Sequence, residues 1–205
     1  MPILGINYQY FKKIIQMGLY VSSLATIPVD AERGYFIYLL DYGWSEPLGE
    51  TLLKNYDKMV VLAAENNAVV IRGTNRVHFQ DQVLSWHNIN GEDAGELLPA
   101  ILITNRNPHR FKESFDNTHH DRVETDLKMI LIPLRKFCTT TTDVVVLIEK
   151  LFNDIKEKKD LSDFKIAREM KKGFGRALAD AIILEPNIGG VGFNFNKMIE
   201  YFLKK

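Results

Sequence analysis

The sequence predicts an α/β protein: a central, mostly parallel sheet of four to five strands with helices on both faces, followed by a helical C-terminal third. Three observations predict this class. Short, continuously apolar runs alternate with longer segments of helical periodicity. A strand, a long helix and a second strand follow one another between residues 35 and 71, which is a βαβ pattern. Apolar residues make up 46% of the 205 residues, enough for one packed core.

The βαβ pattern begins with residues 35–40, which are all apolar and therefore indicate a strand buried on both faces. In the turn that follows, Ser45 is the candidate N-cap and Pro47 falls in the first helical turn. Residues 48–66 repeat apolar side chains every three or four positions, which predicts a helix of about five turns. The second strand is expected at 68–71.

Residues 78–133 also alternate between predicted helices and predicted strands. A helix is expected at 78–89 and a third strand at 99–104. A short helix at 108–115 and a polar, exposed loop at 116–126 separate this strand from a fourth one at 129–133. These elements complete the predicted sheet.

The last third, residues 137–205, is expected to be a mainly helical extension of an α/β domain that spans residues 1–136. Helices are predicted at 143–157, 161–172 and 194–203. No linker-like composition marks the boundary, so a single domain in which the extension packs on the same core is the open alternative.

Charge excludes whole-chain steering toward nucleic acid or membrane, because 26 basic and 26 acidic residues cancel. The charge is nevertheless split along the chain. Residues 1–126 hold 11 basic and 16 acidic residues, whereas residues 127–205 hold 15 basic and 10 acidic ones. Such a split suits docking on a partner or on a second copy, and chance clustering on solvated faces is the alternative.

Compartment and redox chemistry follow from what the sequence lacks. The N-terminus has no secretory signal pattern, and no run of about 18 apolar residues occurs, so we expect a soluble, cytoplasmic protein without membrane contact. The single cysteine, Cys138, allows no intramolecular disulfide. It follows Arg135 and Lys136, whose charges would lower the pKa of its thiol.

Residues 35–104 resemble the core of the thioredoxin-like fold. In that family a buried strand runs into a Trp-Cys-Gly-Pro-Cys turn at the start of a long helix, and a cis-proline later opens a strand beside the turn. The corresponding turn here is Trp44-Ser45-Glu46-Pro47-Leu48, and Pro99 would be the proline. The resemblance implies a cis Leu98–Pro99 peptide.

The departures from that family concern its chemistry. Ser45 and Leu48 stand where the family has its two redox cysteines, so disulfide exchange through this turn is excluded. A flavodoxin-like or TIR-like doubly wound sheet is the competing interpretation of the same strand pattern.

Four residues are candidates for catalysis. Asp41, Glu46 and Glu50 lie where the first strand ends and its helix begins, the edge at which open α/β sheets bind ligands. The alternative is a helix start, where acids are favoured by the dipole. His87 lies near acidic residues and has the chemistry of a general base, with a packing role as the alternative. No glycine-rich phosphate loop follows a strand, so no cofactor is predicted.

Candidate binding residues are mainly basic and suit phosphate or acidic partners. They are Trp44, Arg106, His109, Arg110, Lys171, Lys172 and Arg176. Each basic cluster has the alternative of a solvated helix end. His119, His120 and Asp121 have metal-capable side chains, but no third ligand follows at a typical spacing, and no metal site is predicted.

These observations favour a non-catalytic, redox-inactive module that acts as a protein-interaction subunit of a larger cytoplasmic assembly. Two alternatives stay open. One is an enzyme that acts on a nucleotide or small polar substrate at the carboxyl edge of the sheet. The other is a nucleic-acid-binding accessory protein that uses the basic clusters.

Overall fold

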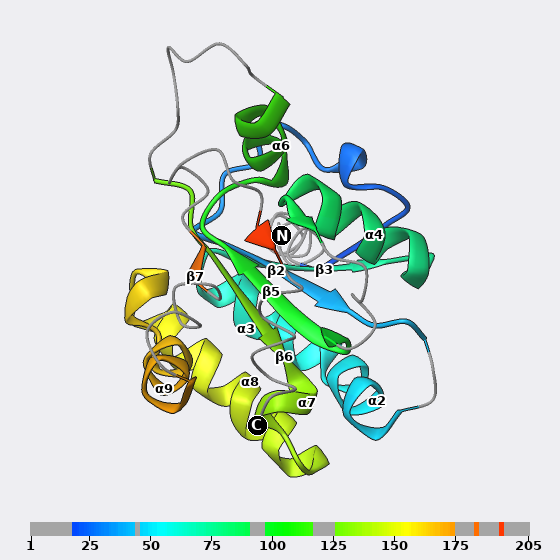
Figure 1. The fold of residues 1–205 in the computed structure, drawn as a ribbon. Helices are drawn as coiled ribbons and strands as arrows, with labels where there is room; N and C mark the ends of the chain where they lie inside the picture. The colour runs from blue at the N-terminus through cyan, green and yellow to red at the C-terminus, as the bar shows by residue number, and fades with distance from the viewer. Residues whose placement is uncertain are drawn as a thin grey trace, which may run out of the picture.

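A computed structural model describes the protein over residues 18–43, 46–90, 97–116, 126–174, 183–184 and 193–194. Within this part the chain forms an α/β structure whose central six-stranded sheet has helices on both faces (Figure 1). Helices α4 (Arg76–Trp86) and α6 (Pro108–Asp116) lie on one side of the sheet. The other side carries α2 (Pro47–Lys54), α3 (Tyr56–Glu65) and α8 (Thr141–Lys156).

The sheet is mixed, with the strand order β1-β3-β2-β5-β6-β7. Its strands are β1 (Gly18–Val21), β2 (Tyr35–Leu40), β3 (Ala68–Gly73), β5 (Ala100–Thr104), β6 (Met129–Pro133) and β7 (Ile183–Leu184). Strand β3 is parallel to both β1 and β2, whereas β5 is antiparallel to β2 and β6, and β7 is antiparallel to β6. A separate pair, β4 (Ile89–Asn90) with β8 (Phe193–Asn194), is parallel.

The prediction of a mostly parallel sheet is therefore corrected. Strands β5 and β6 are buried at every residue, like β2, although they run antiparallel to their neighbours. A continuous apolar run reports burial on both faces and carries no information about strand direction. The boundaries of these strands agree closely with the predicted 99–104 and 129–133.

The long helix predicted for 48–66 is broken at Asn55. The Asn55 side chain donates a hydrogen bond to the Thr51 carbonyl at 2.9 Å, and its backbone lies outside the helical region at φ −88° and ψ 2°. An asparagine side chain that bonds the preceding turn competes with the regular helix ladder. Glu46, rather than Ser45, occupies the N-cap position of α2, and Pro47 begins the helix as predicted.

Two other helices are displaced from their predicted limits. Helix α4 begins at Arg76 because the Asn75 side chain accepts a hydrogen bond from the backbone N–H of His78 at 3.2 Å and caps the first turn. The predicted helix 161–172 divides into a 3₁₀ turn, η2 (Leu161–Asp163), and α9 (Lys165–Phe174). Among the described residues, the other helical elements with assigned bounds are the 3₁₀ turn η1 (Leu24–Thr26) and α7 (Leu134–Phe137).

The Leu98–Pro99 peptide bond before β5 is cis, the conformation that the resemblance implies. Most of the loop 116–126 and of the helix predicted at 194–203 lies outside the described residues. Among the described helices, none combines the length and apolar character needed to cross a bilayer.

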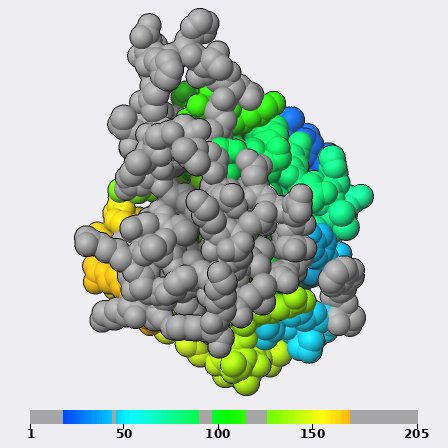
Figure 2. Space-filling model, viewed as in Figure 1, coloured from blue at the N-terminus to red at the C-terminus, as the bar shows by residue number. Residues whose placement is uncertain are grey.

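The sheet and α8 share one hydrophobic cluster. Tyr38 and Ile101 from the sheet and Ile148 and Ile155 from α8 all have essentially no exposed surface and belong to this cluster. Helix α8 begins with a capping box, in which Thr140 and Asp143 bond each other's backbone. It packs against α2, and Figure 2 shows the two helices side by side at the lower edge of the molecule. The division of the chain near Lys136 stays a prediction.

Candidate functional site

The carboxyl end of β2 places Asp41 in an ion pair. Its side chain is 7% exposed, and its Oδ2 lies 3.2 Å from Nη1 of Arg76 at the start of α4. Its Oδ1 accepts a hydrogen bond from the backbone N–H of Gly43 at 3.1 Å. Gly43 has φ +80°, a conformation that favours glycine. Asp41 therefore stabilises the turn after β2.

Glu46 and Glu50 come to the same edge but face different cations. Both carboxylate oxygens of Glu46 accept hydrogen bonds from the Arg135 guanidinium, at 2.9 and 2.7 Å, and this pairing raises the pKa of Arg135. Glu50 is exposed and lies 3.6 Å from Lys54 one turn along α2. The three predicted acids thus do not converge on one free site.

The start of α2 packs closely on the proline that opens β5. A Cβ atom built on Gly49 would lie 3.5 Å from the Cβ of Pro99 and 3.3 Å from Oδ1 of Asp41. The turn residues Trp44 and Ser45 lie outside the described residues. A small cavity nearby, lined in part by Asp41 and Arg76, has a volume of about 10 Å³ and is too small for a substrate.

His87 directly follows the last residue of α4 and is fully buried. Its ring packs between the rings of Tyr38 and Phe111, with centroid distances of 5.1 and 4.8 Å. Its Nδ1 lies 2.7 Å from the Val83 carbonyl oxygen, whereas Nε2 has no hydrogen-bond partner. Burial lowers the pKa of His87 to about 4. A neutral, enclosed imidazole fits a packing role better than that of a general base.

Cys138 is buried, and burial together with the Asp143 carboxylate raises the pKa of its thiol to about 11. The lowered pKa expected from the neighbouring Arg135 and Lys136 is therefore wrong. The physical reason is that burial disfavours the charged thiolate and the Asp143 carboxylate adds to this effect, while the guanidinium of Arg135 is paired with Glu46. At neutral pH the thiol remains protonated and is a poor nucleophile.

The opposite end of the sheet contains a groove of about 650 Å³. It lies where β2 begins and β5 ends, two strand ends that meet because Phe36 pairs with Thr104 in the antiparallel register. Three guanidinium side chains line it, from Arg33 before β2 and from Arg106 and Arg110 after β5. We call this site the arginine groove. Its other lining residues are Val29, Asp30, Ala31, Glu32, Gly34, Phe36, Asn67 and Asn107.

One wall of the arginine groove is held by side chains at the start of α6. The Asn107 amide donates hydrogen bonds to the carbonyls of Pro28 and Ala31, at 2.9 and 3.2 Å. Nε2 of His109 lies 2.9 Å from the Ile27 carbonyl oxygen, and its ring packs edge-on against Trp86. His109, predicted as a binding residue, is thus engaged in holding this wall.

The opposite wall of the groove is held at the turn that follows α3. Asn67 has φ +52°, a left-handed conformation that asparagine tolerates, and its carbonyl accepts a hydrogen bond from the Gly34 N–H at 2.8 Å. One wall is therefore held by side chains that bond backbone carbonyls, and the other by a bond between two backbone groups.

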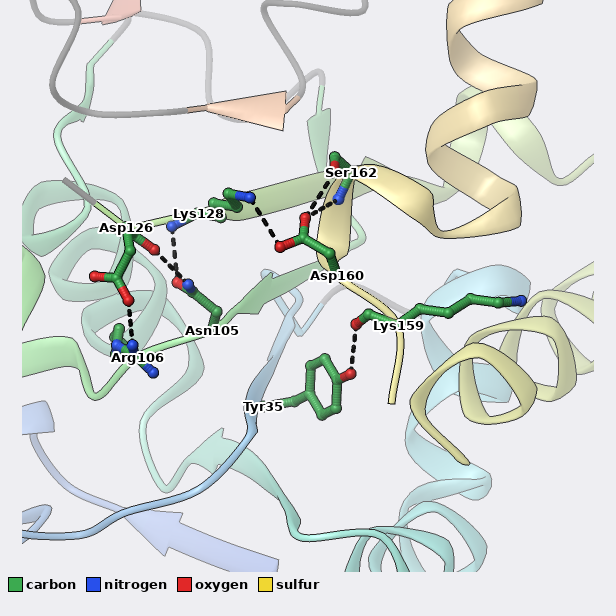
Figure 3. Close-up of polar contacts among 8 residues, drawn as sticks. All are labelled: Tyr35, Asn105, Arg106, Asp126, Lys128, Lys159, Asp160 and Ser162. Carbon is green, nitrogen blue, oxygen red and sulfur yellow. Dashed lines mark hydrogen bonds and ion pairs between the residues drawn. The ribbon is translucent and has the colours of Figure 1, made fainter. Parts of the chain in front are cut away.

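A polar network ties this end of the sheet to the segment after α8 (Figure 3). Asn105 donates to the Asp126 carbonyl and accepts from the Lys128 backbone N–H, which joins the end of β5 to the start of β6. Arg106 pairs with the Asp126 side chain, and Lys128 pairs with Asp160 at 2.8 Å.

Asp160 completes the network beside η2. Burial raises the pKa of its carboxyl, but hydrogen bonds from Lys128 and Ser162 outweigh it and lower the pKa to about 2. The Tyr35 hydroxyl donates to the Lys159 carbonyl at 2.6 Å, which fixes the first residue of β2 to the same segment (Figure 3). The network orders the backbone around Arg106.

The other predicted binding residues are not brought to this groove by the described contacts. The side chains of Lys171 and Lys172 and the whole of Arg176 lie outside the described part of the chain. The same part contains no group of three or more His, Cys, Asp or Glu side chains arranged to hold a metal ion. His119, His120 and Asp121 also fall outside it.

Sequence reasoning found Arg106 and Arg110 but missed Arg33. No other lysine or arginine lies near Arg33 in the sequence, so no cluster of basic residues marks it as a candidate. An antiparallel pairing of the strands at 35–40 and 99–104 would have placed Arg33 beside Arg106, but the predicted sheet was mostly parallel. No protein-family model matches the sequence, and neither a curated protein nor a solved structure matches it.

Proposed function

We propose that this protein is a non-catalytic, redox-inactive α/β module of the thioredoxin-like type that docks on a partner protein as a subunit of a larger assembly. The observation that carries the proposal is the arginine groove. Arg33 lines it from a segment far in sequence from Arg106 and Arg110, and the walls are held by hydrogen bonds to backbone carbonyls. A preformed groove with exposed guanidinium groups is typical of a recognition surface.

The thioredoxin-like part of the proposal rests on the arrangement around β2. This strand is parallel to β3, is followed by the helices α2 and α3, and pairs on its other side with the proline-led β5. The close approach of Gly49 to Pro99 puts the start of α2 beside that proline, as the family resemblance implies.

The non-catalytic part rests on the state of the candidate groups. Asp41 and Glu46 are each engaged by an arginine, the imidazole of His87 is enclosed, and the thiol of Cys138 is buried. Ion-paired carboxylates at a helix start stabilise the fold and are not poised for proton transfer.

The experiment is purification of the tagged full-length protein from its native cells in three forms: wild type, an Arg33→Glu/Arg110→Glu variant, and an Arg168→Glu control. Arg168 is a matched control because it is 59% exposed and pairs with a carboxylate on its own segment, as Arg110 does. We expect a stoichiometric protein partner with the wild type and the control, and its loss from the groove variant. A groove variant that is folded by circular dichroism and retains the partner would refute the docking surface.

A further inference from the structure

We infer that the arginine groove binds the carboxylates of an acidic peptide segment that also carries an apolar side chain. This inference rests on the proposed function and specifies the partner's chemistry. It follows from the pairing of the guanidinium groups, from the balance of charge in the groove and from the character of its rim.

The guanidinium groups of Arg33 and Arg110 can exchange their present partners for a ligand carboxylate. Arg33 donates a hydrogen bond to the Glu32 carbonyl at 2.8 Å, and no ion pair with a carboxylate is found for it among the described residues. Arg110 lies 3.7 Å from Glu113, with both side chains about half exposed. Exposed pairs of this kind contribute little stability, so a ligand carboxylate can replace Glu113 at small cost.

Arg106 differs, because it also lines the groove but is paired with Asp126. The two side chains are 46% and 48% exposed, and Asp126 is itself anchored through the bond from Asn105 to its carbonyl. A carboxylate accepts several hydrogen bonds, and a guanidinium group has five N–H donors. Arg106 therefore has donors left for a ligand while its pair with Asp126 persists.

The charge balance favours a short carboxylate-bearing segment over nucleic acid. Asp30 and Glu32 line the same groove as the three arginines. Nucleic-acid binding gains its affinity from the release of many counterions along a continuous basic surface. Three arginines interrupted by two acids, on a protein with net charge zero, do not form such a surface. They suit a few carboxylates at defined positions, each bound by a guanidinium fork.

The rim adds an apolar contact. Val29 lines the groove and is 55% exposed, next to Ala31 on the same segment. That segment is held by the Asn107 bonds to Pro28 and Ala31, so the apolar rim needs no ordering when a ligand binds. A leucine placed between acidic residues of the ligand would bury part of Val29.

The test uses a fluorescein-labelled octapeptide of the sequence Glu-Glu-Leu-Glu-Glu-Leu-Glu-Glu and fluorescence anisotropy with the full-length protein. Its matched controls are the same peptide with glutamine in place of every glutamate, and a labelled oligothymidylate of eight nucleotides. We expect binding of the acidic peptide, at least about tenfold weaker binding of the glutamine peptide, and weaker binding of the oligonucleotide.

Variants assign the binding to the groove. Arg33→Gln/Arg110→Gln should weaken the acidic peptide about tenfold or more, whereas Arg168→Gln should leave it unchanged. Val29→Ser should weaken it by a few-fold through the lost apolar contact. Equal binding of the glutamine peptide, tighter binding of the oligonucleotide, or an unchanged affinity in the double variant would overturn the inference.

The two proposals fail in distinguishable ways. If the acidic peptide does not bind but the native partner is still lost from the Arg33→Glu/Arg110→Glu variant, the docking groove stands and the acidic-segment inference falls. If the partner is retained by that variant, the docking function of the groove falls, whatever the peptide does.

Discussion

Protonation of His87 should make the protein less stable in mild acid. The imidazole is fully buried between Tyr38 and Phe111, and its Nδ1 bonds the Val83 carbonyl. In the neutral ring Nδ1–H donates that bond and Nε2 carries a lone pair. Protonation would add a charged donor at Nε2, which has no partner in the core.

The magnitude follows from the difference between the folded and unfolded pKa values. Burial lowers the pKa of His87 to about 4 in the folded protein, against about 6.5 in the unfolded chain. As the pH falls, the unfolded chain therefore takes up the proton first. The stabilisation is complete above about pH 6.5 and is lost as the pH falls toward 4. Between pH 7 and pH 5 the free energy of unfolding should fall by about 2 kcal/mol.

Urea unfolding at about pH 7 and pH 5 measures this loss in the wild type, in His87→Phe and in His78→Gln. Phenylalanine keeps an aromatic ring between Tyr38 and Phe111 and removes the titration. His78 is an exposed histidine at the start of the same helix and serves as the control. We expect the wild type and the control to lose about 2 kcal/mol more than His87→Phe.

An equal loss in His87→Phe would refute the reasoning. If that variant does not fold, an NMR titration of the wild-type His87 ring replaces it. A pKa near 6.5 would then show that burial does not act on this ring as described. The carboxyl of Asp160, with a pKa of about 2, titrates below this pH range.

The other predictions concern groups that the structure shows to be engaged. Cys138 should react with Ellman's reagent more than about a hundredfold slower than a free thiol at neutral pH, since its pKa of about 11 leaves little thiolate. Unfolding in guanidinium should restore the normal rate. A fast reaction in the folded protein would contradict the buried state of the thiol. Asp41→Ala should lower the free energy of unfolding by about 1–3 kcal/mol, because it leaves Arg76 and the Gly43 N–H without their acceptor. Glu50→Ala should change it by less than about 0.5 kcal/mol, as expected for an exposed pair within a helix. If thermal or urea unfolding shows that Asp41→Ala has an effect as small as that of Glu50→Ala, Asp41 is not structural.

Much of the fold was predictable because short apolar runs in the sequence indicate which segments are buried. The strand at 35–40 was predicted at its observed limits, since six consecutive apolar residues are rare outside a strand covered on both faces. The break at Asn55 was not predicted, because the apolar repeat continues through it, and the local change of backbone conformation leaves no mark in that repeat.

The candidate site was predictable only in part. Arg106 and Arg110 were predicted as binding residues because they closely follow a predicted strand. Arg33 did not, because its proximity to them depends on the antiparallel pairing of β2 and β5. The ion pair of Asp41 was equally unpredictable, since its partner Arg76 lies in α4, 35 residues further along the chain.

The sequence by itself determined the α/β class, the positions of the buried strands, the absence of thiols from the turn after β2 and the lack of overall charge. Each of these is a property of composition or of short-range order along the chain. The tertiary structure alone decided the direction of β5 and β6, the ion pairs that engage Asp41 and Glu46, and the convergence of three arginines on one groove. These depend on contacts between residues far apart in sequence, for which hydrophobic periodicity carries no signal.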